Sequence, residues 1–524
     1  MQETPTETPV VATLLHGISE ETWGGKFLLG KDLLLPAAPT PTTVQQAPDQ
    51  PTPRTRVKGI VKYPLAPDQP PVEAYIISKD FGKRGLKGAG VSSKGYVHTT
   101  VIPDAYAAAN THMHQDDLSE ESDQAVYIWR VQQQGEQPRT GEQFLSGDPA
   151  LRISEALAVN EDVSSRLSDE RTRDMVHASL VLDLMGLGCS PTELPANGGG
   201  MKKYYIVVPL GVPANDFQDS RTQEAVNTLK GSFLIEQTNV QSGVTQTWNI
   251  EVINVVPEAQ PKGTLYAMTR KLNAQPAISK KIITVVDIGG GDVYKYEFDL
   301  AGGLISTPER IGDGTIAIAR PLAAKIEEAY GIVVSEIEAQ EALYKKTIWK
   351  SGEEVSISAL IEELRPRFAN LLTKLTITNR MLTTFLIFTG GGAALLEKEI
   401  RAKLVARSRQ LQEGSDFLIM PEAIAPVANV VGLFAVGYYK AQKLIKDYVI
   451  AYLDLLGQVS QIGVELEQLR RKTVIRTDDQ QRLQTLQEAR LQLSAQLASH
   501  VGQYYPEVQQ QIQAQRLQAQ PRAI

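Results

Sequence analysis

The pattern of apolar and polar residues between 282 and 298 predicts two strands joined by a glycine turn. Residues 282–286 form a short apolar, β-branched run that predicts a buried strand, which ends at Asp287 and three glycines. Beyond the glycines, aromatic residues recur at a period of two from 294 to 298, which predicts a second strand running back along the first. The backbone of such a turn can approach an anion closely, and an aspartate at the strand end can reach a metal ion. A β-hairpin with a flexible tip is the alternative interpretation.

The same arrangement occurs earlier in the chain. Residues 72–78 predict a strand that ends at Asp80, and the glycine-rich stretch 80–90 that follows contains Lys87. We expect the two turns to face each other around one polyphosphate, to which Lys87 would supply positive charge.

Periodicity predicts further elements around these turns. A strand from residue 385 ends at Gly390, Gly391 and Gly392, where a flat base or ribose would fit against the backbone, and a helix follows over 393–404. A glycine turn over 312–315 predicts the start of a helix that ends near Gly331 and is kinked or restarted at Pro321. The other predicted elements are strands over 124–131 and 203–209 and helices over 168–185, 357–375 and 425–446.

The two ends of the chain differ from its middle. Residues 1–70 are rich in Pro, Thr and Gln, which predicts a disordered arm. Within it, the apolar stretch 14–35 is either a motif that docks on a partner or neighbouring subunit, or an isolated apolar patch. Leucines at spacings of three and four predict a helical hairpin of coiled-coil type over 448–506. A disordered, Gln-rich tail is expected over 507–524.

Composition restricts the class of protein. A length of 524 residues predicts two or more domains, and a net charge of −7 argues against a surface that coats nucleic acid directly. The single cysteine, Cys189, excludes an internal disulfide framework and fits a reducing cytosol. We see neither an apolar run of membrane-spanning length nor a signal sequence, so we expect a cytoplasmic protein without a transmembrane segment. His112, His114 and Asp116 favour a mobile polar loop over a metal site, because their spacing is not that of a structural zinc site.

Six ordered segments resemble the motifs of one superfamily. They are Asp80-x-Gly with Lys87, V-V-P-L-G-V-P (207–213), V-V-P-E-A-Q-P-K-G (255–263), Asp287-Ile-Gly-Gly-Gly, Gly390-Gly-Gly-Ala and A-N-V-V-G-L (428–433). Their kinds and order are similar to those of the actin superfamily, in particular the ParM/StbA-type bacterial actins. The resemblance implies an α/β, actin-like (ribonuclease H-like) fold of two domains. Domain I would span 71–270 and domain II 271–424, with a closing helix over 425–447 returning to domain I.

The resemblance also implies chemistry: ATP or GTP bound with Mg²⁺ between the domains, and slow hydrolysis coupled to filament assembly. Asp80 and Asp287 would hold Mg²⁺ through water, and Glu258 would position the attacking water. The residues implied in nucleotide binding are Gly82, Lys83, Gly85, Lys87, Gly289, Gly290, Gly291, Gly312, Gly314, Thr315, Gly390, Gly391 and Gly392.

Two departures bear on hydrolysis. Relatives have Ser or Thr in the first turn, where this chain has Lys83 and Arg84, and they have no carboxylate at the position of Asp292. A carboxylate near a γ-phosphate costs about a few kcal/mol, and Lys83 across the site is expected to offset it. The alternative is a site that binds nucleotide poorly and turns over little.

Two functions therefore stay open. One is a ParM-like ATPase that forms homopolymer filaments for DNA segregation, through a DNA-binding adaptor, or for cell shape. The other is a structural filament or scaffold with weak or no hydrolysis, which the long arm and the added hairpin favour. A sugar kinase or a chaperone of the superfamily fits less well. The six motifs are those of bacterial actins, and the helical C-terminus supplies no peptide-binding β-domain.

Overall fold

The computed structural model describes residues 59–519 except for short internal gaps. The gaps are 67–68, 83–84, 93–96, 104, 110–125, 136–137, 148–149, 151–156, 159–162, 192–201, 214–216, 218, 273–281, 300–301, 351–352, 374–376, 414–415, 423 and 475. Several predictions lie outside the described residues: the arm up to residue 58 with its apolar stretch, Lys83 and Arg84, and the histidines of 110–125.

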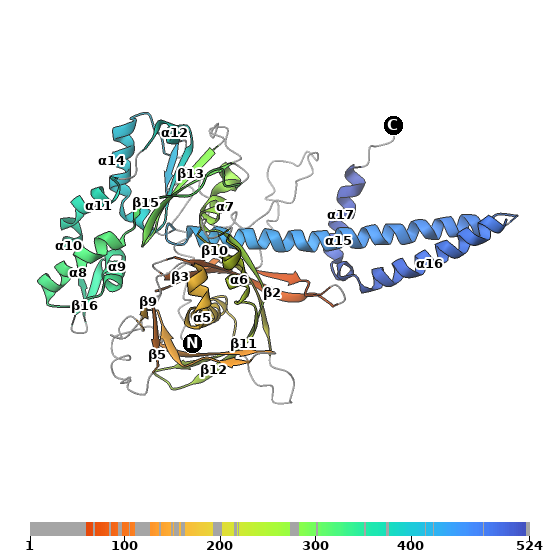
Figure 1. Cartoon of the computed structure of the whole chain (residues 1–524), viewed down its shortest axis with the longest axis horizontal. Coiled ribbons are helices and arrows are strands. Elements are labelled where there is room, and N and C mark those ends of the chain that lie inside the picture. Colours follow the sequence, from red (N-terminus) through yellow and green to blue (C-terminus); the bar gives the residue numbers. More distant parts are fainter. Residues whose placement is uncertain are drawn as a thin grey trace, which may run out of the picture. The chain divides into compact units, whose positions relative to one another are not determined.

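The chain divides into two compact units. One contains Tyr75–Gly437, and the other contains Ile60–Ala74 together with Tyr438–Ile524. The first unit holds two β-sheets and covers both predicted domains, so the boundary expected at residue 270 stays a prediction (Figure 1).

The first sheet is built on an antiparallel meander followed by parallel strands. Its order begins β4-β3-β2-β10-β12, with β2/β3/β4 antiparallel and β10/β12 parallel. These strands are β2 (Val72–Phe81), β3 (Gly85–Val91), β4 (Val97–Pro103), β10 (Tyr204–Val212) and β12 (Thr245–Ala259). The sheet continues through β11 (Gly231–Asn239), β6 (Tyr127–Gln134), β8 (Phe144–Ser146), β5 (Ala105–Ala108) and β9 (Leu157–Ala158), with β7 (Arg139–Thr140) beside β6. Its helices are α4 (Val163–Ser168), α5 (Glu170–Gly186) and α6 (Ser220–Asn227).

The second sheet repeats this order. It runs β15-β14-β13-β18-β19, again an antiparallel meander followed by parallel strands. The strands are β13 (Ile282–Ile288), β14 (Asp292–Asp299), β15 (Glu309–Asp313), β18 (Phe385–Thr389) and β19 (Phe417–Ile419). Two sheets with their strands in the order third, second, first, fourth and fifth define the duplicated actin-like architecture. The predicted fold class is confirmed.

The helices of the second sheet depart from prediction at their breaks. The helix expected over 357–375 is two helices, α10 (Ser358–Glu363) and α11 (Arg365–Leu371), because Pro366 begins the second one. The helix expected over 393–404 is also two, α13 (Gly391–Leu395) and α14 (Glu397–Arg407). Conversely, α8 (Ile316–Tyr330) continues through Pro321, because its buried face of Ile318, Leu322 and Ile326 anchors it. The remaining elements are α9 (Glu336–Lys345), β16 (Thr347–Lys350), β17 (Glu353–Ser356) and α12 (Asn379–Leu382).

Each sheet has its own apolar core. The core of the first contains Trp248, Tyr204 and Phe233 with the apolar face of α5. The core of the second contains Val286, Ile318 and Phe388 with α8 and α14. Strands β2, β10, β13 and β18 are almost wholly buried, which is why they appear in the sequence as apolar runs.

The second unit is mostly helical and corrects three expected boundaries. The closing helix and the first hairpin helix form one helix, α15 (Ala428–Arg470), because nothing between 447 and 448 breaks it. After α16 (Thr477–Ser499) and the short η1 (Val501–Tyr504), residues expected to be disordered form α17 (Pro506–Ala519). Pro506 begins α17, and Ile512 packs in one cluster with Val449. Residues 60–63, expected in the arm, form β1 (Ile60–Tyr63), and Tyr505 Oη donates to the Lys62 carbonyl at 3.2 Å.

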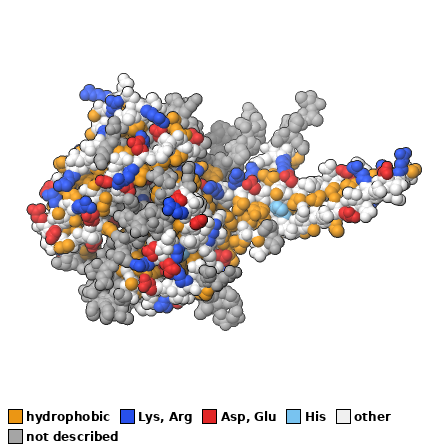
Figure 2. All heavy atoms as spheres, in the orientation of Figure 1, with side chains coloured by type: hydrophobic (Ala, Val, Ile, Leu, Met, Phe, Trp, Pro, Cys, Tyr) orange, Lys and Arg blue, Asp and Glu red, His pale blue; other side chains and the backbone are white. Residues whose placement is uncertain are grey.

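The hairpin keeps much of its apolar surface exposed. No residue of α16 is buried, and Leu456, Val464 and Leu491 are exposed. Figure 2 shows hydrophobic side chains along these helices. By length and composition alone, α15 is the one helix of the described residues that could cross a membrane, a property that core helices of soluble proteins share. Its first turn is buried at Ala428 and Val430.

Candidate functional site

The first glycine turn is a tight hairpin between β2 and β3. Asp80 and Lys87 lie opposite each other in the antiparallel pair, and the Gly85 amide donates to the Gly82 carbonyl at 3.2 Å. The loop expected over 80–90 is therefore shorter than predicted, and Lys87 is held on a strand. Its Nζ lies 3.8 Å from Asp80 Oδ2. Asp80 is 1% exposed, and its Oδ1 has no hydrogen-bond partner among the described residues.

The second glycine turn joins β13 to β14 and has the same construction. Asp287 lies opposite Tyr294, and the Gly289 amide donates to the Asp292 carbonyl at 2.9 Å. The carbonyls of this turn accept bonds from the start of α8: Gly314 N to Gly291 O at 2.8 Å, Thr315 N to Gly289 O at 3.2 Å and Ile316 N to Gly290 O at 2.8 Å.

These bonds correct part of the expected phosphate cradle. The amides of Gly85, Gly289, Gly314 and Thr315 donate to carbonyls inside the turns, so they are not available to an anion. Thr315 Oγ1 lies 2.8 Å from Tyr344 Oη and accepts from Gln340 Nε2 at 2.9 Å. Gly312 lies on β15 opposite Val293. The helix start therefore braces the turn.

The third glycine element lies directly beside Asp287. Gly390 has a φ of +84°, and a Cβ there would lie 2.4 Å from Asp287 Oδ1. A Cβ at Gly392 would lie 2.5 Å from Ile288 Cγ2, and one at Gly391 would lie 3.0 Å from Tyr344 Cε1. Close packing of α13 on the end of β13 thus explains these glycines, next to the nucleotide role that the sequence predicts for them.

Glu258 lies two strands away from Asp80, at the end of β12. It is the register partner of Gly211 on β10, and a Cβ at Gly211 would lie 3.2 Å from Asp80 Oδ1. The first sheet therefore brings Asp80, Gly211 and Glu258 side by side. Glu258 is 2% exposed, and its Oε2 lies 2.9 Å from Lys262 Nζ.

Burial dominates the electrostatics of the two aspartates. It raises the pKa of Asp80, and nearby Asp287 raises it further, whereas Lys87 acts in the opposite direction. Burial also raises the pKa of Asp287, against the effects of Lys87 and of a hydrogen bond from Asn429. The two carboxylates thus repel each other and share one ammonium group.

This donor set fits a hydrated cation. The buried, unpartnered Asp80 Oδ1 needs a positive or hydrogen-bonding partner. No group of three or more His, Cys, Asp or Glu side chains among the described residues forms a protein cage for a metal. Mg²⁺ is ordinarily held in this way, by one or two carboxylates, water and phosphate oxygens.

Asp292 has a partner that the sequence analysis did not identify. Arg310 Nε on β15 donates to Asp292 Oδ1 at 2.6 Å, and the Arg310 guanidinium also donates to Asp313 at 2.8 Å. Charge compensation for Asp292 thus comes from a neighbouring strand. The expected compensation by Lys83 lies outside the described residues.

Three further residues near the aspartates were given no role from sequence. Gln260 Nε2 donates to the Phe81 carbonyl at 2.9 Å, Lys262 pairs with Glu258, and Asn429 donates to Asp287. Each lies inside a quoted motif, so the motifs located them, but only the geometry shows what they contact.

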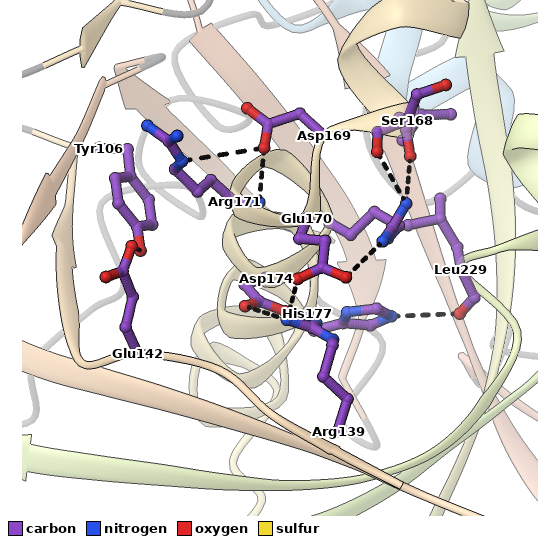
Figure 3. Close-up of polar contacts among 12 residues, drawn as sticks. Tyr106, Arg139, Glu142, Ser168, Asp169, Glu170, Arg171, Asp174, His177 and Leu229 are labelled. Carbon is purple, nitrogen blue, oxygen red and sulfur yellow. Dashed lines mark hydrogen bonds and ion pairs between the residues drawn. The ribbon is translucent and has the colours of Figure 1, made fainter. Parts of the chain in front are cut away.

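A separate polar cluster joins α5 to β7 (Figure 3). Arg139 contacts Glu170 at 3.2 Å and pairs with Asp174, whose Oδ2 accepts at 3.1 Å. His177 lies 3.2 Å from the Leu229 carbonyl, and burial lowers its pKa to about 4. These groups bond to one another and to the backbone, which is the pattern of a structural network.

Comparison with known proteins gives similarity at the level of fold. No protein-family model matches the chain, and no curated protein matches it. An archaeal actin homologue is 18% identical over 70% of this chain and 99% of its own, with a TM-score of 0.46. Apo ParM of pSK41 is 19% identical over 71% and 98%, with a TM-score of 0.45. A 15-stranded ParM filament from Clostridium botulinum is 17% identical over 70% and 99%, with a TM-score of 0.43. The repeated strand order, with an aspartate–glycine turn in each sheet, identifies this chain as a protein of actin-like fold.

Proposed function

We propose that this chain binds a nucleoside triphosphate, ATP or GTP, with Mg²⁺ between its two sheets. One observation carries the proposal. Asp80 and Asp287 end corresponding strands of two like-ordered sheets, sense each other's charge and share Lys87. Asp80 is buried and Asp287 is partly buried, and two such carboxylates that repel each other are unfavourable unless a cation joins them.

The residues of the chain divide the work by chemistry. Asp80 and Asp287 orient the water around the metal, and Lys87 contributes a fixed positive charge for a phosphate oxygen. The amides of Gly290 and Gly291 face the anion from a turn braced by α8. When bound, Mg²⁺ neutralises phosphate charge, which is the main requirement of phosphoryl transfer.

Filament assembly is the second part of the proposal. It rests on the six sequence motifs, whose resemblance is to polymerising bacterial actins. DNA segregation through a DNA-binding adaptor, or support of cell shape, would be the use of such a homopolymer in the cytoplasm.

A structural filament or scaffold with weak hydrolysis is the second candidate, and one observation favours it. Glu258, the residue expected to position water, is held by Lys262 Nζ at 2.9 Å. A carboxylate in an ion pair is a poorer acceptor for the attacking water. The scaffold candidate predicts filaments that form with nucleotide but release almost no phosphate.

Sedimentation with parallel phosphate release tests both parts. Purified protein at micromolar concentration should pellet with Mg²⁺ and ATP or a non-hydrolysable analogue, and remain soluble with EDTA. Phosphate release above the protein-free blank would support the ATPase function. Pelleting without phosphate release would support the scaffold function. A monomer under every nucleotide condition contradicts assembly.

A further inference from the structure

The chain passes between its two sheets through two helices among the described residues. The first-sheet strands end at Ala259, and the second sheet spans Ile282 to Ile419. The outward passage contains α7 (Gln260–Leu272), and the return passage is the start of α15. Gly437 of α15 approaches Pro209 of β10, where a Cβ would lie 2.0 Å from Pro209 Cγ.

These two helices touch backbone to backbone. A Cβ at Gly263 would lie 2.0 Å from the Asn429 carbonyl oxygen, and a Cβ at Gly432 would lie 1.7 Å from the Gly263 carbonyl oxygen. No side chain larger than hydrogen fits at either position without moving a helix. The crossing is therefore a close contact between the connections of the two sheets.

Asn429 joins this crossing to the site. Its Nδ2 donates to Asp287 Oδ2 at 3.1 Å, and its Oδ1 accepts from Thr264 Oγ1 at 2.6 Å and from the Thr264 amide at 3.3 Å. Thr264 Oγ1 also lies 3.1 Å from Oγ1 of Thr389, the register partner of Asp287 on β18. Hydrogen bonds thus link Thr389, Thr264, Asn429 and Asp287 in a line. Its first three residues are buried, and Asp287 is partly exposed.

The chemistry of this line requires an amide at residue 429. The carboxylate of Asp287 accepts only, and the Thr264 amide donates only, so the residue between them must present a donor on one side and an acceptor on the other. Asparagine does this with a fixed orientation. Aspartate would face a second carboxylate, and alanine would leave both neighbours unpaired.

Asp80 is held differently. Its nearest ionic contact is Lys87 at 3.8 Å, and α7 reaches its hairpin through Gln260 Nε2 at the neighbouring Phe81 carbonyl. The first residue of α7 therefore contacts the first glycine turn, and Thr264 further along the helix contacts Thr389, which precedes Gly390. Gln260 also hydrogen-bonds the Asp80 carboxylate. Asp287 is bonded instead to Asn429, which lies at the contact of the two helices.

We propose that Asn429 is a positioning residue that couples the orientation of the Asp287 carboxylate to the crossing of α7 and α15. A rotation of one sheet against the other would move these helices past each other and strain the three bonds to the Asn429 amide together. The site and the crossing would then change state together. The proposal rests on the proposed function for its ligand, but the crossing itself exists without nucleotide.

The test measures the distance between the sheets by spin labels. Cys189 is replaced by Ser, and labels are placed at two exposed positions, Glu224→Cys on α6 and Glu328→Cys on α8. Distances are recorded without nucleotide and with Mg²⁺ and a non-hydrolysable ATP analogue. The variants are Asn429→Ala and Thr264→Val, and Thr264→Ser keeps the hydroxyl as a rescue. Thr284→Val is the matched control, because it removes the buried Thr284–Thr384 bond of 2.7 Å elsewhere in the second sheet.

We expect Asn429→Ala and Thr264→Val to broaden the nucleotide-free distance distribution and to reduce the nucleotide-induced shift by half or more. Nucleotide affinity should fall about tenfold, while Thr264→Ser and Thr284→Val should match the parent. Equal widths in all proteins, or equal broadening in Thr284→Val, would overturn the coupling. If the parent binds no nucleotide, the proposed function fails and the nucleotide-free widths still decide the role of Asn429. If Asn429→Ala does not fold, the Thr264 pair decides.

Discussion

Two glutamates of one strand show how position decides the role of a residue. Glu258 and Glu251 both lie on β12, and each pairs with a lysine, at 2.9 and 2.8 Å. Glu258 lies at the end of the strand, next to Gly211 and Asp80, whereas Glu251 lies near the middle of the strand and pairs with Lys203. Of the two glutamates, only Glu258 lies at the site proposed for the nucleotide.

Glu258→Gln should therefore lower phosphate release by ~10²-fold and leave nucleotide affinity within a few fold. The substitution keeps the size of the side chain and removes its charge, so that a positioning role is lost before a binding role. Glu251→Gln should change neither quantity. If affinity falls as steeply as turnover, or turnover is unchanged, Glu258 does not position water.

His177 gives a dependence of stability on pH that is separate from the site. Its folded-state pKa of about 4 lies below that of an exposed histidine, because the ring is buried and the charges of Arg139 and Arg173 lower the pKa further. The folded protein resists protonation at this ring. The stability linked to neutral His177 is complete above about pH 6.5 and is lost as the pH falls towards 4.

We expect this loss to reach roughly 2 kcal/mol at pH 5. His177→Gln keeps a donor for the Leu229 carbonyl and removes the titration. Urea unfolding at pH 7.5, 6 and 5 should show the wild type losing more stability than the variant as the pH falls. Parallel losses in the two proteins would show that His177 titrates as an exposed histidine does.

At the scale of elements, a buried ion pair fastens α5 to the first sheet. Lys79 of β2 pairs with Asp183 of α5, and both side chains are fully buried. Thr100 Oγ1 of β4 donates to Asp183 Oδ1 at 2.7 Å. Burial lowers the pKa of Lys79, against the attraction of Asp183. Removal of one partner leaves the other charge uncompensated in the core.

Lys79→Met should destabilise the protein by roughly 3–5 kcal/mol, and the double variant Lys79→Met/Asp183→Leu should recover much of this loss. Lys203→Met, which breaks the part-exposed pair with Glu251, should cost about 1 kcal/mol or less. Urea unfolding of the four proteins measures the effect. A single variant as stable as the Lys203 control would mean that Asp183 is solvated.

Strands could be predicted from sequence where they are buried on both faces, because such strands are continuous apolar runs. Strands β13, β2, β10 and β18 appear as apolar runs because both of their faces are covered. Strand β3 was missed because its glycine-rich sequence, G-L-K-G-A-G-V, resembles a loop. Its glycines are needed where Asp183 approaches: a Cβ at Gly88 would lie 2.5 Å from the carboxylate of that residue. That contact is invisible in sequence.

At the scale of the whole molecule, motif order predicted the duplicated fold and the two aspartates of the site. It could not predict bonds between residues far apart in the chain, such as Asn429 to Asp287, which are 142 positions apart. Nor could it predict that the backbone amides at the start of α8 donate to the carbonyls of the second glycine turn. The last helix, α17, was not predicted, because its Gln-rich sequence is typical of disorder. The structure shows that Ile512 of this helix packs in an apolar cluster.

The central claim is that Asp80 and Asp287 together hold a magnesium–nucleotide complex. Calorimetric titration of wild type, Asp80→Asn and Asp287→Asn with ATP, in Mg²⁺ and in EDTA, tests it most directly, with Asp169→Asn of the α5 cap as the control. We predict one bound nucleotide per chain in Mg²⁺, and at least tenfold weaker binding in each site variant. In EDTA the variants should bind as well as the wild type or better, because a carboxylate repels phosphate when no cation lies between them. Failure of the wild type to bind, or Mg²⁺-dependent binding that survives both substitutions, would contradict the account.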